Sequence, residues 1–191
     1  MKRTATLRQR GQLDDMLNEF LPNWATVDIN TLAMIPAPPR HELGVADKLL
    51  SETFCDQAGV DSYNRKHGKL LWLLHTMCDF EQAINECSRH LTAPTLYDMK
   101  MIDQAISCMA RIRHMDEDYL VLGGLDGVQI ISTCDTSYAG HRDLKSHTGG
   151  TLHMSHTTGA FMATCKKQTT PADSAMPAEG LGAHIQIRRH Q

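Results

Sequence analysis

The stretch CDTSYAGHRDLKSHTGG, residues 134–150, places a carboxylate at the end of an apolar run. Residues 128–133 form that run, which is typical of a β-strand, and Asp135 falls where it ends. A carboxylate at a strand end can face a cleft and take part in chemistry there, and it can equally be a turn residue. From the residues alone, both interpretations of Asp135 stay open.

Histidine and cysteine side chains in the same region raise the question of a zinc site. They are His141, His147, His153 and His156, with Cys134 and Cys165. Zinc in proteins takes ligands of these types at characteristic spacings. His153 and His156 are three residues apart on a predicted strand and therefore point to opposite faces, and no second pair has the spacing of a zinc site. Surface or partly buried histidines are the favoured interpretation.

Charged side chains offer two further candidates. Lys166 and Lys167, together with Arg142 and Lys145, could contact the phosphates of a nucleic acid, and a solvated surface explains them equally well. The acidic pair at residues 14–15 lies on the polar face of a helical pattern without flanking strands. We interpret this pair as solvated carboxylates and not as a catalytic pair.

Composition limits the classes of protein to consider. The chain has 191 residues, 41% of them hydrophobic, which is enough for one ordinary domain or two small ones. The net charge of −3 shows no global basic excess, so any nucleic-acid binding depends on local patches. The six cysteines have no C-x-x-C spacing and the charged start shows no apolar leader segment, which predicts reduced thiols in an intracellular protein. No apolar run approaches the ~20 residues of a membrane span, so no membrane partner is expected.

The first half of the chain carries apolar stripes at helical spacing. Leu13, Met16, Leu17 and Phe20 fall at i, i+3, i+4 and i+7 and predict an amphipathic helix over about residues 5–20. A proline-rich stretch at 35–40 follows and predicts an extended connector.

Two capping patterns predict later helices. Asp79 has the position of an N-cap, and Thr95 with Asp98 resembles a capping box. The stripe formed by Ile102 and its neighbours at 106 and 109 predicts core packing on the second of these helices.

After residue 114 the pattern changes from helical to strand-like. Runs at 119–122 and 128–133, separated by Gly and Asp-Gly, predict a hairpin, and further strands are expected at 151–154 and 160–165. A helix is expected from Ser174 to about Arg189. The predicted fold class is therefore α+β, with a helical region at 1–115 and a β-meander followed by a helix at 116–191.

Short motifs in a fixed order resemble the Pol polyprotein of copia-type LTR retrotransposons, from the end of the reverse transcriptase into the ribonuclease H domain. The motifs are LRQRGQLDDMLNEF at 7–20, IPAPP at 35–39, GKLLWL at 68–73, CDFEQAINECSRHLTAPTLYDMK at 78–100, CDTSYAG at 134–140, KSHTGG at 145–150 and KKQTTPADSAMPAEGLGA at 166–183. CDTSYAG is similar to the family's TDASYAG, and Ala178-Glu179-Gly180 falls on its A-E-Y motif. Together the motifs cover nearly the whole chain.

The resemblance implies a fold and an activity for each region. Residues 1–115 would correspond to the helical thumb and connection of a reverse transcriptase, and 116–191 to a truncated ribonuclease-H-like domain of three strands and one helix. In the family, four carboxylates hold two Mg²⁺ ions that promote cleavage of the RNA strand of an RNA–DNA hybrid. Asp135 and Glu179 match two of these four catalytic, metal-binding carboxylates. The implied parent activities are RNA-directed DNA synthesis and hybrid cleavage, with the hybrid and the remainder of the Pol polyprotein as partners.

Departures from the family pattern modify this expectation. Pro177 replaces the family's glutamate and Gly180 its tyrosine, and the positions of the other two ribonuclease H aspartates and of the polymerase Tyr-Val-Asp-Asp hairpin fall outside this sequence. We therefore expect this chain to be inactive on its own. The alternative hypothesis is a non-catalytic nucleic-acid-binding or scaffold relic of such an element.

Overall fold

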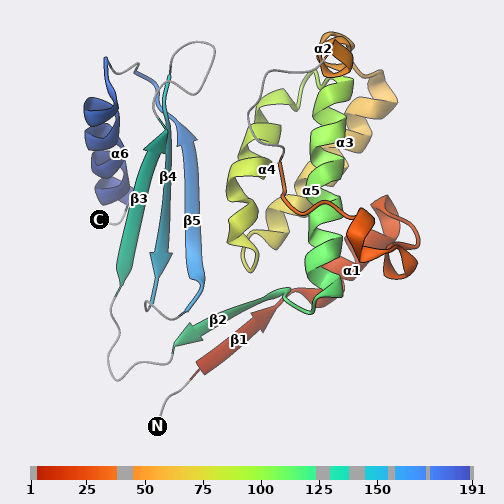
Figure 1. The fold of residues 1–191 in the computed structure, drawn as a ribbon, viewed down its shortest axis with the longest axis horizontal. Coiled ribbons are helices and arrows are strands. Elements are labelled where there is room, and N and C mark those ends of the chain that lie inside the picture. Colours follow the sequence, from red (N-terminus) through yellow and green to blue (C-terminus); the bar gives the residue numbers. More distant parts are fainter. Residues whose placement is uncertain are drawn as a thin grey trace. The chain divides into compact units, whose positions relative to one another are not determined.

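The computed structural model describes residues 4–37, 45–123, 130–137, 145–154, 158–170 and 173–189. Its contacts divide the chain into two compact units: Arg8–Tyr119, and Leu120–Gln191 together with Met1–Leu7. The first unit is helical, and the second contains strands and one helix (Figure 1). The mixed helix and sheet content agrees with the predicted α+β class.

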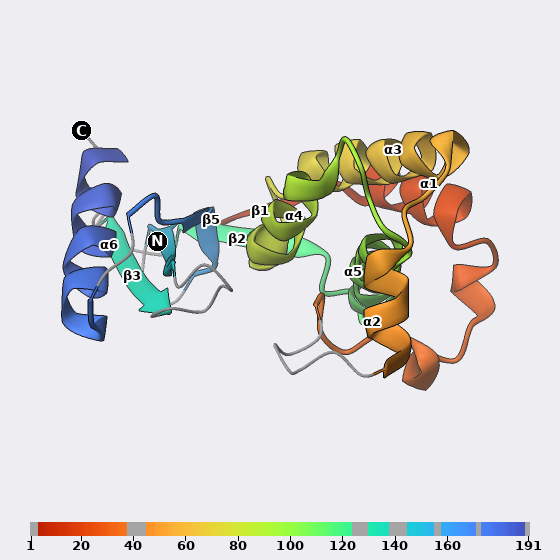
Figure 2. The same cartoon turned by 90° about the horizontal axis from the view of Figure 1, so that it is seen from above.

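Helices build the first unit. They are α1 (Arg10–Phe20), α2 (Val45–Glu52), α3 (Gln57–Leu73), α4 (Glu81–Cys87) and α5 (Leu96–His114), with short 3-10 turns η1 (Trp24–Thr26), η2 (Ile29–Thr31), η3 (Cys78–Phe80) and η4 (Ser88–His90). Helix α1 packs beside α3, and α2 packs on α5 (Figure 2). The described helices include none that is long and apolar enough to span a membrane.

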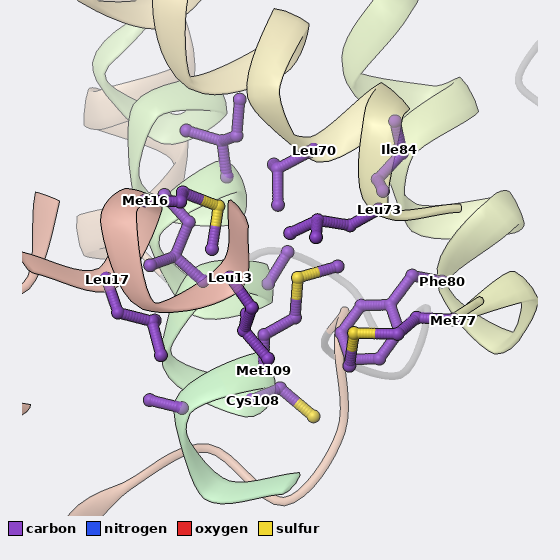
Figure 3. Packing of buried hydrophobic residues seen from close by; sticks show 14 of the residues in the cluster. Leu13, Met16, Leu17, Leu70, Leu73, Met77, Phe80, Ile84, Cys108 and Met109 are labelled. Carbon is purple, nitrogen blue, oxygen red and sulfur yellow. The ribbon is translucent and has the colours of Figure 1, made fainter. Parts of the chain in front are cut away.

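The core of this unit is formed where α1, α3, α4 and α5 converge (Figure 3). Its most deeply buried side chains include Leu13, Met16 and Leu17 of α1, Tyr63, Leu70 and Leu73 of α3, Ile84 of α4, and Ile102, Ile106 and Met109 of α5. The prediction that the stripe on α5 is core packing is confirmed. The Tyr63 hydroxyl donates to the backbone carbonyl of Cys87 at 2.8 Å, which satisfies the polar end of a buried ring.

Two predicted helix starts differ from the structure. The helix predicted over 5–20 begins only at Arg10, because Thr4–Arg8 forms strand β1 and pairs with β2 (Tyr119–Gly123). The predicted cap at Asp79 is wrong, because Asp79 lies inside η3 and α4 begins after Phe80 with no side-chain cap. The capping box at the start of α5 is confirmed: Asp98 N donates to the Thr95 hydroxyl, and Thr95 N donates to the Asp98 carboxylate.

The second unit contains an antiparallel three-stranded sheet, ordered β3 (Ile131–Ser137), β4 (His147–His153) and β5 (Ala160–Lys167). Helix α6 (Ala175–Arg189) follows and packs on β3 and β4. The hairpin predicted between 119–122 and 128–133 is wrong, because β2 pairs with β1 while β3 pairs with β4. The predicted helix beginning near Ser174 is confirmed as α6.

Candidate functional site

The two faces of the β3–β4–β5 sheet can be told apart by their contacts with α6. Gly182 of α6 is buried, and a Cβ atom added there would collide with the side chain of Thr136 on β3 and would lie 3.1 Å from the side chain of Thr148 on β4. These two threonines lie opposite each other in the strand register. They therefore mark the face of the sheet that α6 covers.

A buried glutamine connects α6 to this face by hydrogen bonds. Gln168 is 2% exposed, and its Nε2 atom donates to Thr148 Oγ1 at 2.9 Å and to the backbone carbonyl of Ala178 at 2.8 Å. A carbonyl can only accept, so the amide nitrogen must face Ala178. This contact holds the first turns of α6, which carry Glu179, against the end of the sheet.

Asp135 lies on the other face of the sheet. It belongs to β3, two residues before the strand ends at Ser137, so the strand continues past the end that the sequence pattern predicted near Asp135. Because successive side chains of a strand alternate, Asp135 points away from the α6 face that Thr136 marks. Its side chain is exposed, lies opposite Gly149, and accepts a hydrogen bond from Thr136 N at 2.9 Å.

Glu179 is not brought together with Asp135. It is exposed on α6, next to the fully buried Ala178, and so lies on the helix side of the sheet. Over the described ranges, no group of three or more His, Cys, Asp or Glu side chains could hold a metal ion. These two carboxylates do not fit the pair of Mg²⁺ ions that the resemblance implies, and no metal-dependent step follows from them.

The predicted basic patch is distributed over both faces of the sheet. Lys166 pairs with Thr148 on the α6 side, and Lys167 pairs with His147 on the opposite side. Lys145 comes two residues before His147, just ahead of β4, and Arg142 lies outside the described residues. Successive side chains of a strand point to opposite faces, so the sequence alone already indicated that Lys166 and Lys167 lie on different faces.

A close contact between a histidine and a cysteine was not predicted. The Nε2 atom of His147 on β4 lies 2.8 Å from the Sγ atom of Cys165 on β5. Both residues belong to the face that carries Asp135. Cys165 pairs with Gly149, which lies opposite Asp135, and His147 comes two residues before Gly149 on the same strand. The two residues are 18 positions apart, and only the register of β4 and β5 brings them together.

The helical unit has an open pocket of about 230 Å³ between α1 and α3, lined by Gln12, Asp15, Lys69 and Trp72. Trp72 is 65% exposed, and its ring stacks on His75. The interpretation of the acidic pair as solvated holds for Asp15, which is exposed, but not for Asp14. The Asp14 carboxylate is half-buried and accepts from Arg113 Nε at 2.7 Å.

Comparison of the chain with family models, with curated proteins and with solved structures found no match.

Proposed function

We propose that this chain corresponds to the stretch of a copia-type retrotransposon Pol polyprotein that runs from the end of the reverse transcriptase into the ribonuclease H domain. The observation that supports the proposal most strongly is the order of elements: a helical unit, then an antiparallel meander of β3, β4 and β5, then α6. Asp135 lies on the first strand of that meander and Glu179 on the helix that follows it. These are the kinds of element on which the resemblance expects the two carboxylates.

We further propose that the chain by itself does not cleave RNA–DNA hybrids. Two-metal hydrolysis needs carboxylates that converge on two ions about 4 Å apart. Asp135 and Glu179 lie on opposite sides of the sheet, so the two carboxylates cannot bind the same metal ion.

The cleavage proposal is tested with the full chain, an end-labelled RNA–DNA hybrid, and Mg²⁺ or Mn²⁺. We expect no product above the level of a buffer control. The matched variants are Asp135→Asn and, as a control distant in sequence, Glu52→Gln, which is exposed on α2. Cleavage by the wild-type chain that disappears in Asp135→Asn and persists in Glu52→Gln would show that the chain is an active nuclease.

A second candidate function is non-catalytic binding of the hybrid, and one observation favours it. Lys167 lies on the face of the sheet that α6 leaves uncovered, and Lys145 precedes the strand that pairs with it. Two cations near one face of the sheet can contact one phosphate backbone, whereas Lys166 lies on the other face. The hybrid is thus expected to lie along the Lys167 side.

This binding hypothesis predicts unequal effects of two neighbouring substitutions. Lys167→Gln should weaken hybrid binding and reduce the slope of log affinity against log salt by about one, because one phosphate contact is lost. Lys166→Gln is the matched control and should leave the slope unchanged. Fluorescence anisotropy of a labelled hybrid at several salt concentrations measures both. Equal slopes for the wild type and Lys167→Gln, or no binding at low salt, would refute the hypothesis.

A further inference from the structure

The contact between His147 and Cys165 places a proton acceptor directly against a thiol. The distance from Nε2 to Sγ is 2.8 Å, within hydrogen-bond range for this pair of atoms. His147 is 6% exposed, while Cys165 keeps an intermediate exposure. The imidazole is therefore held in the sheet, whereas Cys165 is partly exposed.

Charged and titratable groups lie around this pair, two of them on the same face of the sheet. Lys167 on β5 lies opposite His147, and Asp135 on β3 lies on the same face beside Gly149. Lys145 comes just before β4, and Glu179 on α6 belongs to the other side of the sheet. Lys167 and Asp135 carry opposite charges, and both lie on the face of the sheet that carries His147 and Cys165.

The other thiols of the chain have surroundings that keep them protonated. Burial raises the pKa of Cys55 and Cys108, and it raises the pKa of Cys78 and of Cys87 to about 11. Burial, and then the adjacent Asp135 carboxylate, also raise the pKa of Cys134, even though Cys134 is an exposed residue. Cys134 is thus an internal reference for the reactivity of Cys165. Because Cys134 is the more exposed residue of the two, easier access would favour reaction at Cys134.

We propose that His147 and Cys165 form an imidazolium–thiolate pair, and that Cys165 is a modification site which exchanges with low-molecular-weight disulfides. A histidine beside a cysteine stabilises the thiolate, which is the form that reacts. This inference is independent of the proposed function, because it rests on the contact between His147 of β4 and Cys165 of β5 and on the exposure of the two residues.

The exchange step balances without any further reagent. The Cys165 thiolate attacks one sulfur of the disulfide R–S–S–R, a new S–S bond forms to Cys165, and the old S–S bond breaks. The departing sulfur leaves with the electron pair as a thiolate. The proton that Cys165 gave to His147 then passes to this thiolate, directly or through solvent, so the products are the mixed disulfide and one thiol.

The experiment measures the reactivity of each thiol in the native full chain. The chain is treated briefly with iodoacetamide between about pH 6 and pH 10, a range that spans the ordinary thiol pKa of about 8.5. After quenching and digestion, mass spectrometry gives the alkylation rate at every cysteine. We expect the midpoint of the rate profile of Cys165 to lie at least about one pH unit below 8.5, and that of Cys134 to lie above it. This comparison within one sample needs no variant.

A pair of histidine variants assigns the effect to the contact. His147→Gln should move the midpoint of Cys165 up to the ordinary thiol value or above. His153→Gln is the matched control, because His153 bonds to Thr151 and to the Thr158 carbonyl on the same face and should leave the profile unchanged. A Cys165 midpoint at or above that of Cys134, or one that His147→Gln does not move, would overturn the proposal.

The exchange itself is tested with oxidised glutathione at neutral pH. We expect the mixed disulfide to form first at Cys165 and to be reversed by dithiothreitol. Earlier or equal labelling of Cys134 would contradict the assignment of Cys165 as the exchange site.

Discussion

Replacing Leu70 with alanine is expected to lower the free energy of unfolding of the helical unit by about 2–5 kcal/mol. Leu70 is 0% exposed and lies on α3 where α1, α4 and α5 converge (Figure 3). The loss has two parts, because the substitution removes buried apolar atoms and leaves a cavity that the packed helices fill only partly. Urea unfolding followed by far-UV circular dichroism measures it, since helices dominate that signal.

The neighbouring residue Leu71 supplies the matched control. It has the same side chain on the same helix but is 44% exposed. Leu71→Ala should change the free energy of unfolding by less than about 1 kcal/mol, because little buried surface is lost and alanine is a good helix former. Equal effects of the two substitutions would contradict the burial of Leu70 in the core between these helices.

Replacing Gly182 with alanine is expected to destabilise the packing of α6 on the sheet by about 1–3 kcal/mol. An added Cβ atom would collide with Thr136 Oγ1 and would lie 3.1 Å from both Oγ1 and Cγ2 of Thr148. The backbones of both threonines are fixed in paired strands, so either their side chains change rotamer or α6 moves away from the sheet. The better helix propensity of alanine, worth about 1 kcal/mol, offsets only part of this cost.

Gly180 on the same helix serves as the control with the opposite sign. A Cβ atom added at Gly180 meets nothing within 4 Å. Gly180→Ala should therefore stabilise α6 by up to about 1 kcal/mol. Amide hydrogen exchange of α6 and β3, resolved by mass spectrometry, distinguishes the two: exchange should become faster in Gly182→Ala and slower in Gly180→Ala. Faster exchange in both variants would contradict the packing of α6 against Thr136 and Thr148.

Local patterns predicted the elements that depend on neighbouring residues. The spacing of Leu13, Met16 and Leu17 identified the buried face of α1, and all three side chains are at most 1% exposed. Thr95 and Asp98 identified the start of α5, because a capping box involves only residues three apart. The extent of α6 was also predicted, although Gly180 and Gly182 weaken its helical propensity.

Features that depend on distant residues could not be predicted in the same way. Strand β1 forms because Thr4–Arg8 pairs with Tyr119–Gly123. The predicted helix included these residues, although its helical spacing begins only at Leu13. The contact of His147 with Cys165 depends on the register of two strands, which no motif indicates. The opposite placement of Asp135 and Glu179 depends on which face α6 covers, and that follows from tertiary packing at Gly182.

We propose descent from a retrotransposon Pol region, and sequencing the transcript and locus on both sides of this reading frame tests that descent. We expect a recognisable Tyr-x-Asp-Asp segment upstream and two further ribonuclease-H-type aspartates downstream, either in frame or interrupted by stop codons. Flanking sequence that encodes neither feature, in any frame, would contradict it.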